Sequence, residues 1–203
     1  SYPGTIKASV LYGTSGDNIP VEKVKSIVFD EGVTIVRASY LFMNCKSLES
    51  VKGTPVIADS VNSLDYLFYR CGKLKNVDFL ESWNVSNVES LAVAFSECSS
   101  LENVNGLKSW DVSKVKSMGG IFMDCPALCD ISGLKNWNTS SLYDCDNAFY
   151  NCSGITSLCS LSEWDVSNMH SCPEMFSGCT GLKDLDGLQK WNVSAMDRVF
   201  GMF

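Results

Sequence analysis

The stretch WNVSNVESLAVAFSECSSLENVNGLKS, residues 83–109, is followed directly by WDVSKVKSMGGIFMDCPALCDISGLKN, residues 110–136. The two stretches agree at their tryptophan, at a phenylalanine twelve residues later and at a cysteine three residues after that. The tryptophan recurs every 27 residues, at Trp83, Trp110, Trp137, Trp164 and Trp191. A period of this length is typical of repeat proteins, in which each unit buries its apolar face only against its neighbours.

The phenylalanine and the cysteine extend the repeat beyond the tryptophans. The pairs are Phe42/Cys45, Phe68/Cys71, Phe95/Cys98, Phe122/Cys125, Phe149/Cys152 and Phe176/Cys179. The last copy stops at Phe203, before its cysteine. We therefore expect the chain to be a fragment of a longer protein, because a solenoid needs capped ends.

Within one repeat, the apolar spacing predicts a short helix and a short strand. Met118, Ile121, Phe122 and Cys125 stand at i, i+3, i+4 and i+7, the inward face of a helix of about two turns. The residue before this window is Ser or Asp in each copy, and both are good N-caps. The segment LENVNGL, residues 101–107, predicts a strand that ends at Gly106, and a second extended piece is expected over V-S-x-V. The chain is thus expected to form right-handed coils, each with a short parallel β-strand and a short helix.

The first 30 residues do not follow the repeat. The segment VEKVKSIVFDEGVTIV, residues 21–36, predicts two strands around a turn at Asp30–Gly32. We expect an N-terminal arm and cap over residues 1–30 and a repeat solenoid over residues 31–203.

Composition excludes several classes of function. The net charge of −7, from 16 Lys+Arg against 23 Asp+Glu, argues against a nucleic acid or an anionic membrane surface as partner. No run of about 18 apolar residues exists, so direct membrane insertion is not expected, and the N-terminus does not resemble a signal peptide. His170 is the single histidine, and Glu89, Lys116, Tyr143 and Asp197 hold its position in other repeats. We expect no catalytic residue, no metal site and no cofactor.

The tryptophans allow two interpretations. They could form an exposed strip that stacks on sugars, or an internal stack whose indole N–H groups bond loop carbonyls. The neighbouring positions are apolar, which favours the internal stack.

A second row of polar residues follows each tryptophan: Asn84/Ser86, Asp111/Ser113, Asn138/Ser140, Asp165/Ser167 and Asn192/Ser194. It could present a calcium or ice face, but Asx and Ser side chains more often bond local backbone groups at a turn. With only two carboxylates in five copies, we favour the structural role. Asn84 and Asn192 also match the N-glycosylation pattern, which the repeat itself explains.

Ten cysteines could form disulfides or remain as thiols. Six of them, from Cys45 to Cys179, share one repeat position, and Cys145 and Cys172 share another. Residues at one position on adjacent coils lie within disulfide range, yet a buried thiol also packs as a small apolar side chain. We favour free thiols, and the alternative stays open.

The repeats W-[DN]-V-S-x-[VM]-x-x-[MLC]-x-x-x-F-x-x-C, as in WNVSNVESLAVAFSEC, resemble the BspA-type leucine-rich repeats of bacterial surface proteins. The resemblance covers roughly residues 24–203. It implies a leucine-rich-repeat-like solenoid from a bacterial cell-surface or secreted protein. It also implies adhesion to host or microbial surface proteins, and it brings no catalytic motif. Thr139 in place of the usual Val, and Cys145 and Cys172 in the Leu/Met position, depart from the pattern.

Function is expected where the repeats differ, because the shared positions are used for packing. The outward positions of the predicted strand form a polar, acidic strip, and the candidate ligand-facing residues are Asn103, Asn105, Asp130, Asp184 and Asp186. The leading hypothesis is a non-catalytic module for adhesion or protein–protein binding. The alternative is a structural stalk or spacer that displays another domain. An enzyme would need paired carboxylates in a cleft, for which Asp184 and Asp186 are a weak signal.

Overall fold

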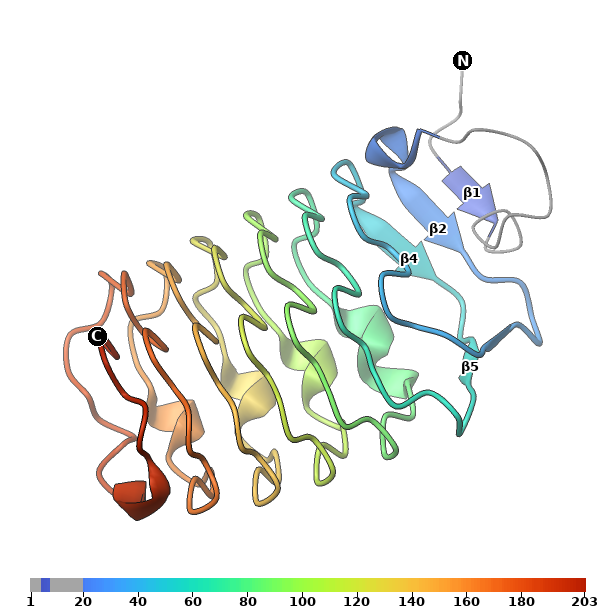
Figure 1. Cartoon of the computed structure of the whole chain (residues 1–203). Helices are drawn as coiled ribbons and strands as arrows, with labels where there is room; N and C mark the ends of the chain where they lie inside the picture. Colours follow the sequence, from blue (N-terminus) through green and yellow to red (C-terminus); the bar gives the residue numbers. More distant parts are fainter. Residues whose placement is uncertain (1–4, 8–19) are drawn as a thin grey trace.

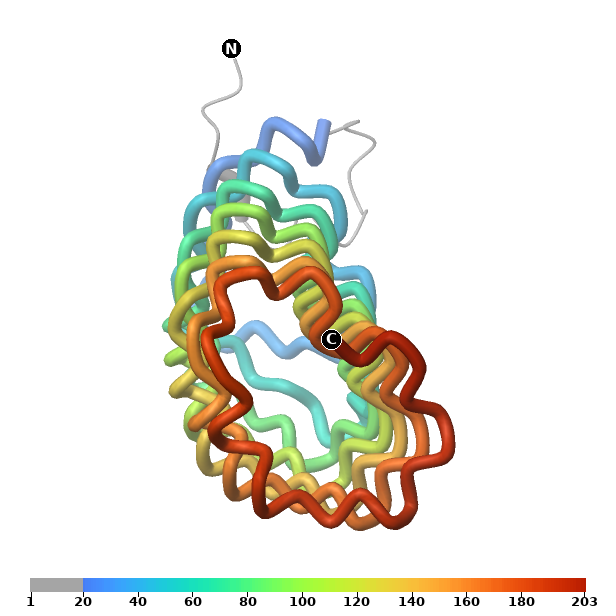
Figure 2. The backbone as a smooth tube through the Cα atoms, turned by 90° about the vertical axis from the view of Figure 1, so that its left-hand side faces the viewer, coloured from blue at the N-terminus to red at the C-terminus, as the bar shows by residue number. Residues whose placement is uncertain are grey.

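The computed structural model describes residues 5–7 and 20–203. In this part of the chain each repeat forms one coil, and the coils stack side by side (Figure 1). Figure 2 views the stack from one end and shows the coils lying over one another with nearly the same outline. Equivalent residues of successive repeats are therefore neighbours in space, and each repeat position forms a row that runs along the stack.

The first coils are joined by short parallel strands. β1 (Thr5–Lys7), β2 (Ser26–Val28) and β4 (Ser50–Lys52) form one sheet, and β3 (Thr34–Ile35) pairs with β5 (Val56–Ile57). The expected turn at residues 30–32 does lie between β2 and β3. Each of these strands pairs with the following coil, and they do not pair with each other. Residues 1–4 and 8–19 of the predicted arm lie outside the described residues, and the division at residue 30 stays a prediction.

Later coils contain turns and short 3₁₀ helices in place of strands. A first 3₁₀ helix, η1 (Val21–Lys23), precedes β2. The others are η2 (Asp78–Ser82), η3 (Asn105–Leu107), η4 (Ser132–Leu134), η5 (Cys159–Leu161) and η6 (Val193–Ala195). Single parallel bridges connect the coils along one row, which we call the bridge row: Ser63, Ser90, Ser117, Asp144, Ser171 and Arg198.

The predicted helix over residues 118–125 is wrong. This segment is a series of turns whose alternate N–H groups donate to the next coil, as Phe122 does to the carbonyl of Ala148 at 2.9 Å. An α-helix would direct that N–H to residue 118, four residues back. Two positions in each coil, two residues before and two residues after the phenylalanine, have positive φ, as Gly120 (61°) and Asp124 (58°) do. A left-handed residue at every fourth position is incompatible with a helix and suits consecutive β-turns.

The residues that were predicted to be helix N-caps close these turns with their side chains. The side-chain oxygens of Ser63 and Asp144 accept from the N–H two residues later, at 3.0 and 2.9 Å. Local side-chain bonding was therefore the correct inference, but it closes a turn and not a helix. The predicted strand over residues 101–107 is reduced to one bridge between Asn103 and Asp130. The V-S-x-V segment is also a turn, because the Val88 N–H donates to the carbonyl of Val85 at 2.8 Å.

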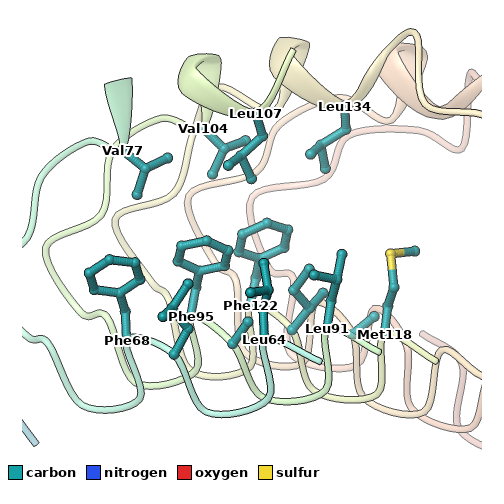
Figure 3. Close-up of a cluster of buried hydrophobic side chains, with 14 of the residues drawn as sticks. Leu64, Phe68, Val77, Leu91, Phe95, Val104, Leu107, Met118, Phe122 and Leu134 are labelled. Atoms are coloured by element: carbon teal, nitrogen blue, oxygen red, sulfur yellow. The ribbon is translucent and has the colours of Figure 1, made fainter. Parts of the chain in front are cut away.

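Phenylalanine rings fill the interior. The phenylalanines at the repeat position, Phe42, Phe68, Phe95, Phe122, Phe149 and Phe176, are at most 1% exposed. Each of these rings stacks on the next with centroids 4.8–5.7 Å apart. Figure 3 shows Phe68, Phe95 and Phe122 facing Val77 and Val104 across the coil. Offset aromatic pairs add to the gain from burial, so the ring row holds the coils in register.

Candidate functional site: the outward rows of the coils

The tryptophans belong to the core, which excludes the sugar-stacking strip. They are 3–8% exposed, and the indole Nε1 of Trp110, Trp137, Trp164 and Trp191 donates at 2.9–3.0 Å to a leucine carbonyl 30 residues earlier. The predicted indole–carbonyl bond is confirmed in these four coils.

All ten cysteines are free thiols. Five of them donate to the carbonyl of a phenylalanine one coil back: Cys71, Cys98, Cys125, Cys152 and Cys179, at 3.0–3.2 Å. Burial raises the pKa of Cys45, Cys172 and Cys179 to about 11. A thiol of such high pKa is a poor nucleophile at neutral pH, so these buried cysteines, at both repeat positions, have a packing role.

The polar row after each tryptophan closes turns. In all five copies the Asn or Asp Oδ1 accepts from the serine N–H two residues later, at 3.0–3.3 Å. The predicted structural role of this row is confirmed.

The candidate strip consists of two adjacent rows, and we call it the acidic strip. The first row is Asn76, Asn103, Asp130, Ser157 and Asp184, and the second is Asp78, Asn105, Ser132, Cys159 and Asp186. In every coil the first-row oxygen accepts from the second-row N–H, at 2.9–3.4 Å. The first row therefore closes turns as well, and one oxygen of each first-row carboxylate is used inside the protein.

The structure brings three of the five predicted site residues together. The Asn105 amide donates to Asp130 Oδ2 at 3.0 Å, and Asn103 forms the bridge to Asp130. Hydrogen bonds from Ser132 lower the pKa of Asp130, so this carboxylate stays charged at neutral pH. All three residues are half-buried, and the Asn103 oxygen accepts the Asn105 backbone N–H, so they offer less to a ligand than the sequence indicated.

The other two predicted residues lie further along the strip. Asp184 and Asp186 are separated from the coil of Asp130 by the coil that carries Ser157 and Cys159. Both are exposed, and each has one carboxylate oxygen with no partner among residues 20–203. They are the accessible charges of the acidic strip.

One polar group that the sequence analysis missed lies on the bridge row. Ser117 Oγ donates to Asp144 at 2.8 Å, and Ser171 Oγ donates to Asp146. Partial burial raises the pKa of Asp146; the hydrogen bond from Ser171 lowers it and the neighbouring Asp144 raises it. Together with Lys116 and Arg198, these side chains line a hollow of about 660 Å³. In the sequence, the sign of this polar group is Asp144, which stands at a repeat position where Ser117 and Ser171 flank it in the adjacent coils.

Opposite charges at one repeat position pair across adjacent coils. Lys116 lies 2.8 Å from Glu89, Lys108 3.0 Å from Glu81, and Lys190 2.7 Å from Glu163. Exposed pairs of this kind contribute little to stability, about 0–1 kcal/mol each. They neutralise part of the surface charge, and a charge without such a partner stays available to a ligand.

His170 takes part in a surface row and not in a catalytic arrangement. Its ring stacks on Tyr143 at 4.8 Å, and its Nδ1 lies 3.5 Å from Asp197. Within the described part of the chain, no group of three or more His, Cys, Asp or Glu side chains could hold a metal ion. Nor is any helix among these residues long and apolar enough to cross a membrane.

Stacked coils with internal Trp, Phe and Cys rows and variable outer rows define a repeat protein. The sequence pattern of DUF285, described as "Mycoplasma protein of unknown function", matches residues 36–157 and 127–203. The chain therefore belongs to the DUF285 family. No curated protein matches it.

Three solved structures are similar to the chain at low identity. A leucine-rich repeat protein from Eubacterium ventriosum is 18% identical with a TM-score of 0.41, over 79% of this chain and 41% of that one. A leucine-rich cell surface protein from Faecalibacterium prausnitzii is 19% identical with a TM-score of 0.29, over 84% and 60%. A leucine-rich repeat protein from Bacteroides ovatus is 12% identical with a TM-score of 0.20, over 88% of this chain and 84% of that one. The chain thus spans less than two thirds of the first two proteins. With TM-scores below 0.5, these likenesses do not bear on its function.

Proposed function

We propose that the chain is a non-catalytic, surface-exposed repeat module of a bacterial cell-surface or secreted protein. It acts in adhesion or protein–protein binding through the acidic strip, with a host or microbial surface protein as partner. One observation carries the proposal: the residues that the repeats share face inward or close turns, whereas variable side chains, such as Asp184 and Asp186, face solvent on the strip. A stack of coils adds surface area with each repeat, so several weak contacts sum to a useful affinity.

The test compares two double variants of equal charge change. Asp130→Asn with Asp184→Asn removes two charges from the acidic strip and keeps an oxygen for each turn. Asp111→Asn with Asp165→Asn makes the same change in the row after the tryptophans, where both residues accept the same kind of bond. The unchanged chain and both variants are passed over immobilised matrix proteins and mucins on a sensor surface.

We expect saturable binding that the strip variant weakens by about tenfold or more and that the control variant leaves unchanged, in line with loss of charged contacts. Equal loss in both variants would indicate a general charge effect and contradict the assignment to the strip. No binding to any surface would favour the alternative, a structural stalk or spacer.

A further inference from the structure

A separate hollow lies on the first coils, at the opposite end of the described stack from Asp184 and Asp186. Its volume is about 520 Å³, and Arg37, Ser39, Tyr40, Ser60, Asn62 and Ser63 supply its polar lining. Three further hollows on the described surface contain carboxylates: Asp184 in one, Glu97 and Asp124 in the second, Asp144 and Asp146 in the third. This hollow contains none among its lining residues, although the chain as a whole carries a net charge of −7.

The guanidinium of Arg37 provides an uncompensated positive charge. Arg37 is exposed and forms no ion pair within residues 20–203. Arg198 occupies the same repeat position at the other end of the bridge row, and its Nη2 lies 3.9 Å from Asp146. Asp146 lies two coils before Arg198, and its row is held by Ser39 in the coil of Arg37 and by Asp65 in the next coil. The Asp65 carboxylate accepts from Ser90 Oγ and from the Ala92 N–H, and it does not pair with Arg37. Arg198 thus has a carboxylate within ion-pair distance, and Arg37 has none among residues 20–203.

Neutral groups beside Arg37 are available to a ligand. Ser39 Oγ donates to Ser63 Oγ at 2.9 Å, and Ser63 Oγ also accepts the Asp65 N–H at 3.0 Å. With its lone pairs used, the Ser63 hydroxyl has its own hydrogen left to donate. The hydroxyl of Ser60 and the amide of Asn62 have no hydrogen-bond partner among the described residues, and both side chains are exposed.

An aromatic ring borders the hollow. Tyr40 is 56% exposed, and its ring is fixed by stacking on Tyr66, with centroids 5.0 Å apart and planes 10° apart. Rigid tyrosines give contact area at low entropic cost. The hollow thus combines a guanidinium, groups that both donate and accept, and a pre-ordered ring edge.

We propose that this hollow binds an acidic sugar, with the sugar's sulfate or carboxylate on Arg37 and its hydroxyls on Ser60, Asn62 and Ser63. A guanidinium binds an oxyanion through two parallel N–H bonds, which gives orientation as well as attraction. Hydroxyl and amide groups match the vicinal hydroxyls of a sugar, each of which donates and accepts. An acidic peptide fits less well, because its neighbouring backbone and side chains would meet one charge and no apolar groove. The site is independent of the acidic strip, whose charge repels the same ligands.

The test titrates the chain with matched disaccharide derivatives: 3′-sulfolactose, 3′-sialyllactose and neutral lactose, with a short Asp/Glu peptide as a fourth ligand. Binding is followed by saturation-transfer difference NMR and by calorimetry. Arg37→Gln removes the charge of the site. Arg198→Gln is the matched control, because it makes the same change at the same repeat position. Thermal unfolding verifies that both variants fold.

We expect one or both acidic sugars to bind at least about tenfold more tightly than lactose, as a charge-assisted contact provides. Arg37→Gln should abolish this preference and Arg198→Gln should leave it intact. Binding of the sulfated sugar alone, or of the sialylated sugar alone, identifies which oxyanion the site takes. Equal binding of lactose, equal loss in both variants, or no binding of either acidic sugar would overturn the proposal. Binding of the peptide alone, if lost in Arg37→Gln, would keep the anion site and overturn the sugar.

Discussion

The indole Nε1 of Trp137 donates a 2.9 Å hydrogen bond to the carbonyl oxygen of Leu107, one coil earlier. Trp83 is buried to the same degree, at 4% against 3% exposed, but its indole has no such bond within the described residues. Trp137 also stacks on the rings of Trp110 and Trp164. Trp191 donates the same bond to Leu161 at 2.9 Å and, like Trp83, stacks on no ring among the described residues. Trp191 and Trp83 therefore separate the contribution of this bond from the contribution of ring burial.

Trp191→Phe should lower the free energy of unfolding by about 1 kcal/mol more than Trp83→Phe does. Both substitutions shrink a buried ring, and only the first removes an internal hydrogen bond, which is worth about 1 kcal/mol. The measurement is urea unfolding followed by circular dichroism. Equal losses would mean that the bond between coils adds nothing to ring packing.

Ser96→Ala should stabilise the chain by about 1 kcal/mol. The Ser96 side chain is 0% exposed, and its Oγ has no hydrogen-bond partner, so the folded state buries an unpaired hydroxyl. Ser99→Ala is the control, because Ser99 is exposed and its hydroxyl bonds the Gly72 carbonyl at 3.4 Å. A thermal unfolding midpoint that rises in the control as much as in Ser96→Ala would contradict the explanation.

Val93→Asn should also stabilise the chain, by about 1 kcal/mol, because a β-branched residue is strained at positive φ. Val93 has φ of 60°, and Asn147 holds the same repeat position at 57°. The native chain thus already contains the proposed side chain in this conformation. The reverse change, Asn147→Val, should destabilise by a similar amount in the same urea experiment. A loss of stability in Val93→Asn would show that packing of the valine outweighs the strain.

The repeat position of Val93 and Asn147, two residues before the phenylalanine, explains why the sequence did not predict the turns. Residues two before the phenylalanine are Tyr40, Tyr66, Val93, Gly120, Asn147, Glu174 and Gly201. A left-handed backbone normally favours Gly or Asn, and four of these seven are neither. No local propensity therefore signals it, and the bonds that impose it come from a coil 26–27 residues away. Trp, Phe and Cys were placed correctly because burial depends on the repeat period alone.

The candidate site was only partly predictable for a related reason. Sequence identified which positions vary, and Asp184 and Asp186 are indeed exposed. It did not show that Asn103 and Asp130 turn an oxygen back to their own backbone, because an Asx turn and a solvated strand residue have the same composition. Nor could it show that Arg37 lacks the counter-charge that Arg198 has. That difference depends on Arg198 reaching Asp146 two coils earlier and on Asp65 accepting from Ser90 without pairing with Arg37.

Alkaline pH should destabilise the chain through its buried thiols. Burial raises the pKa of Cys45, Cys172 and Cys179 from 9.0 to about 11, and the pKa of Cys125 lies well above 9.0. Below pH 9 these thiols are protonated in both states and contribute no pH dependence. Above pH 9 the unfolded chain loses their protons and the folded chain keeps them, so stability falls as pH rises towards 11.

Cys125→Ala isolates one thiol from the tyrosines and lysines that titrate in the same range. We measure the unfolding free energy in urea between pH 9 and 10.5 and plot it against pH. The slope for Cys125→Ala should be shallower than that of the unchanged chain, by an amount that corresponds to about one bound proton at most. Cys129→Ala is the control, because it removes an exposed thiol from the same chain. If the two variants show the same slope, the buried row is not held protonated by the fold.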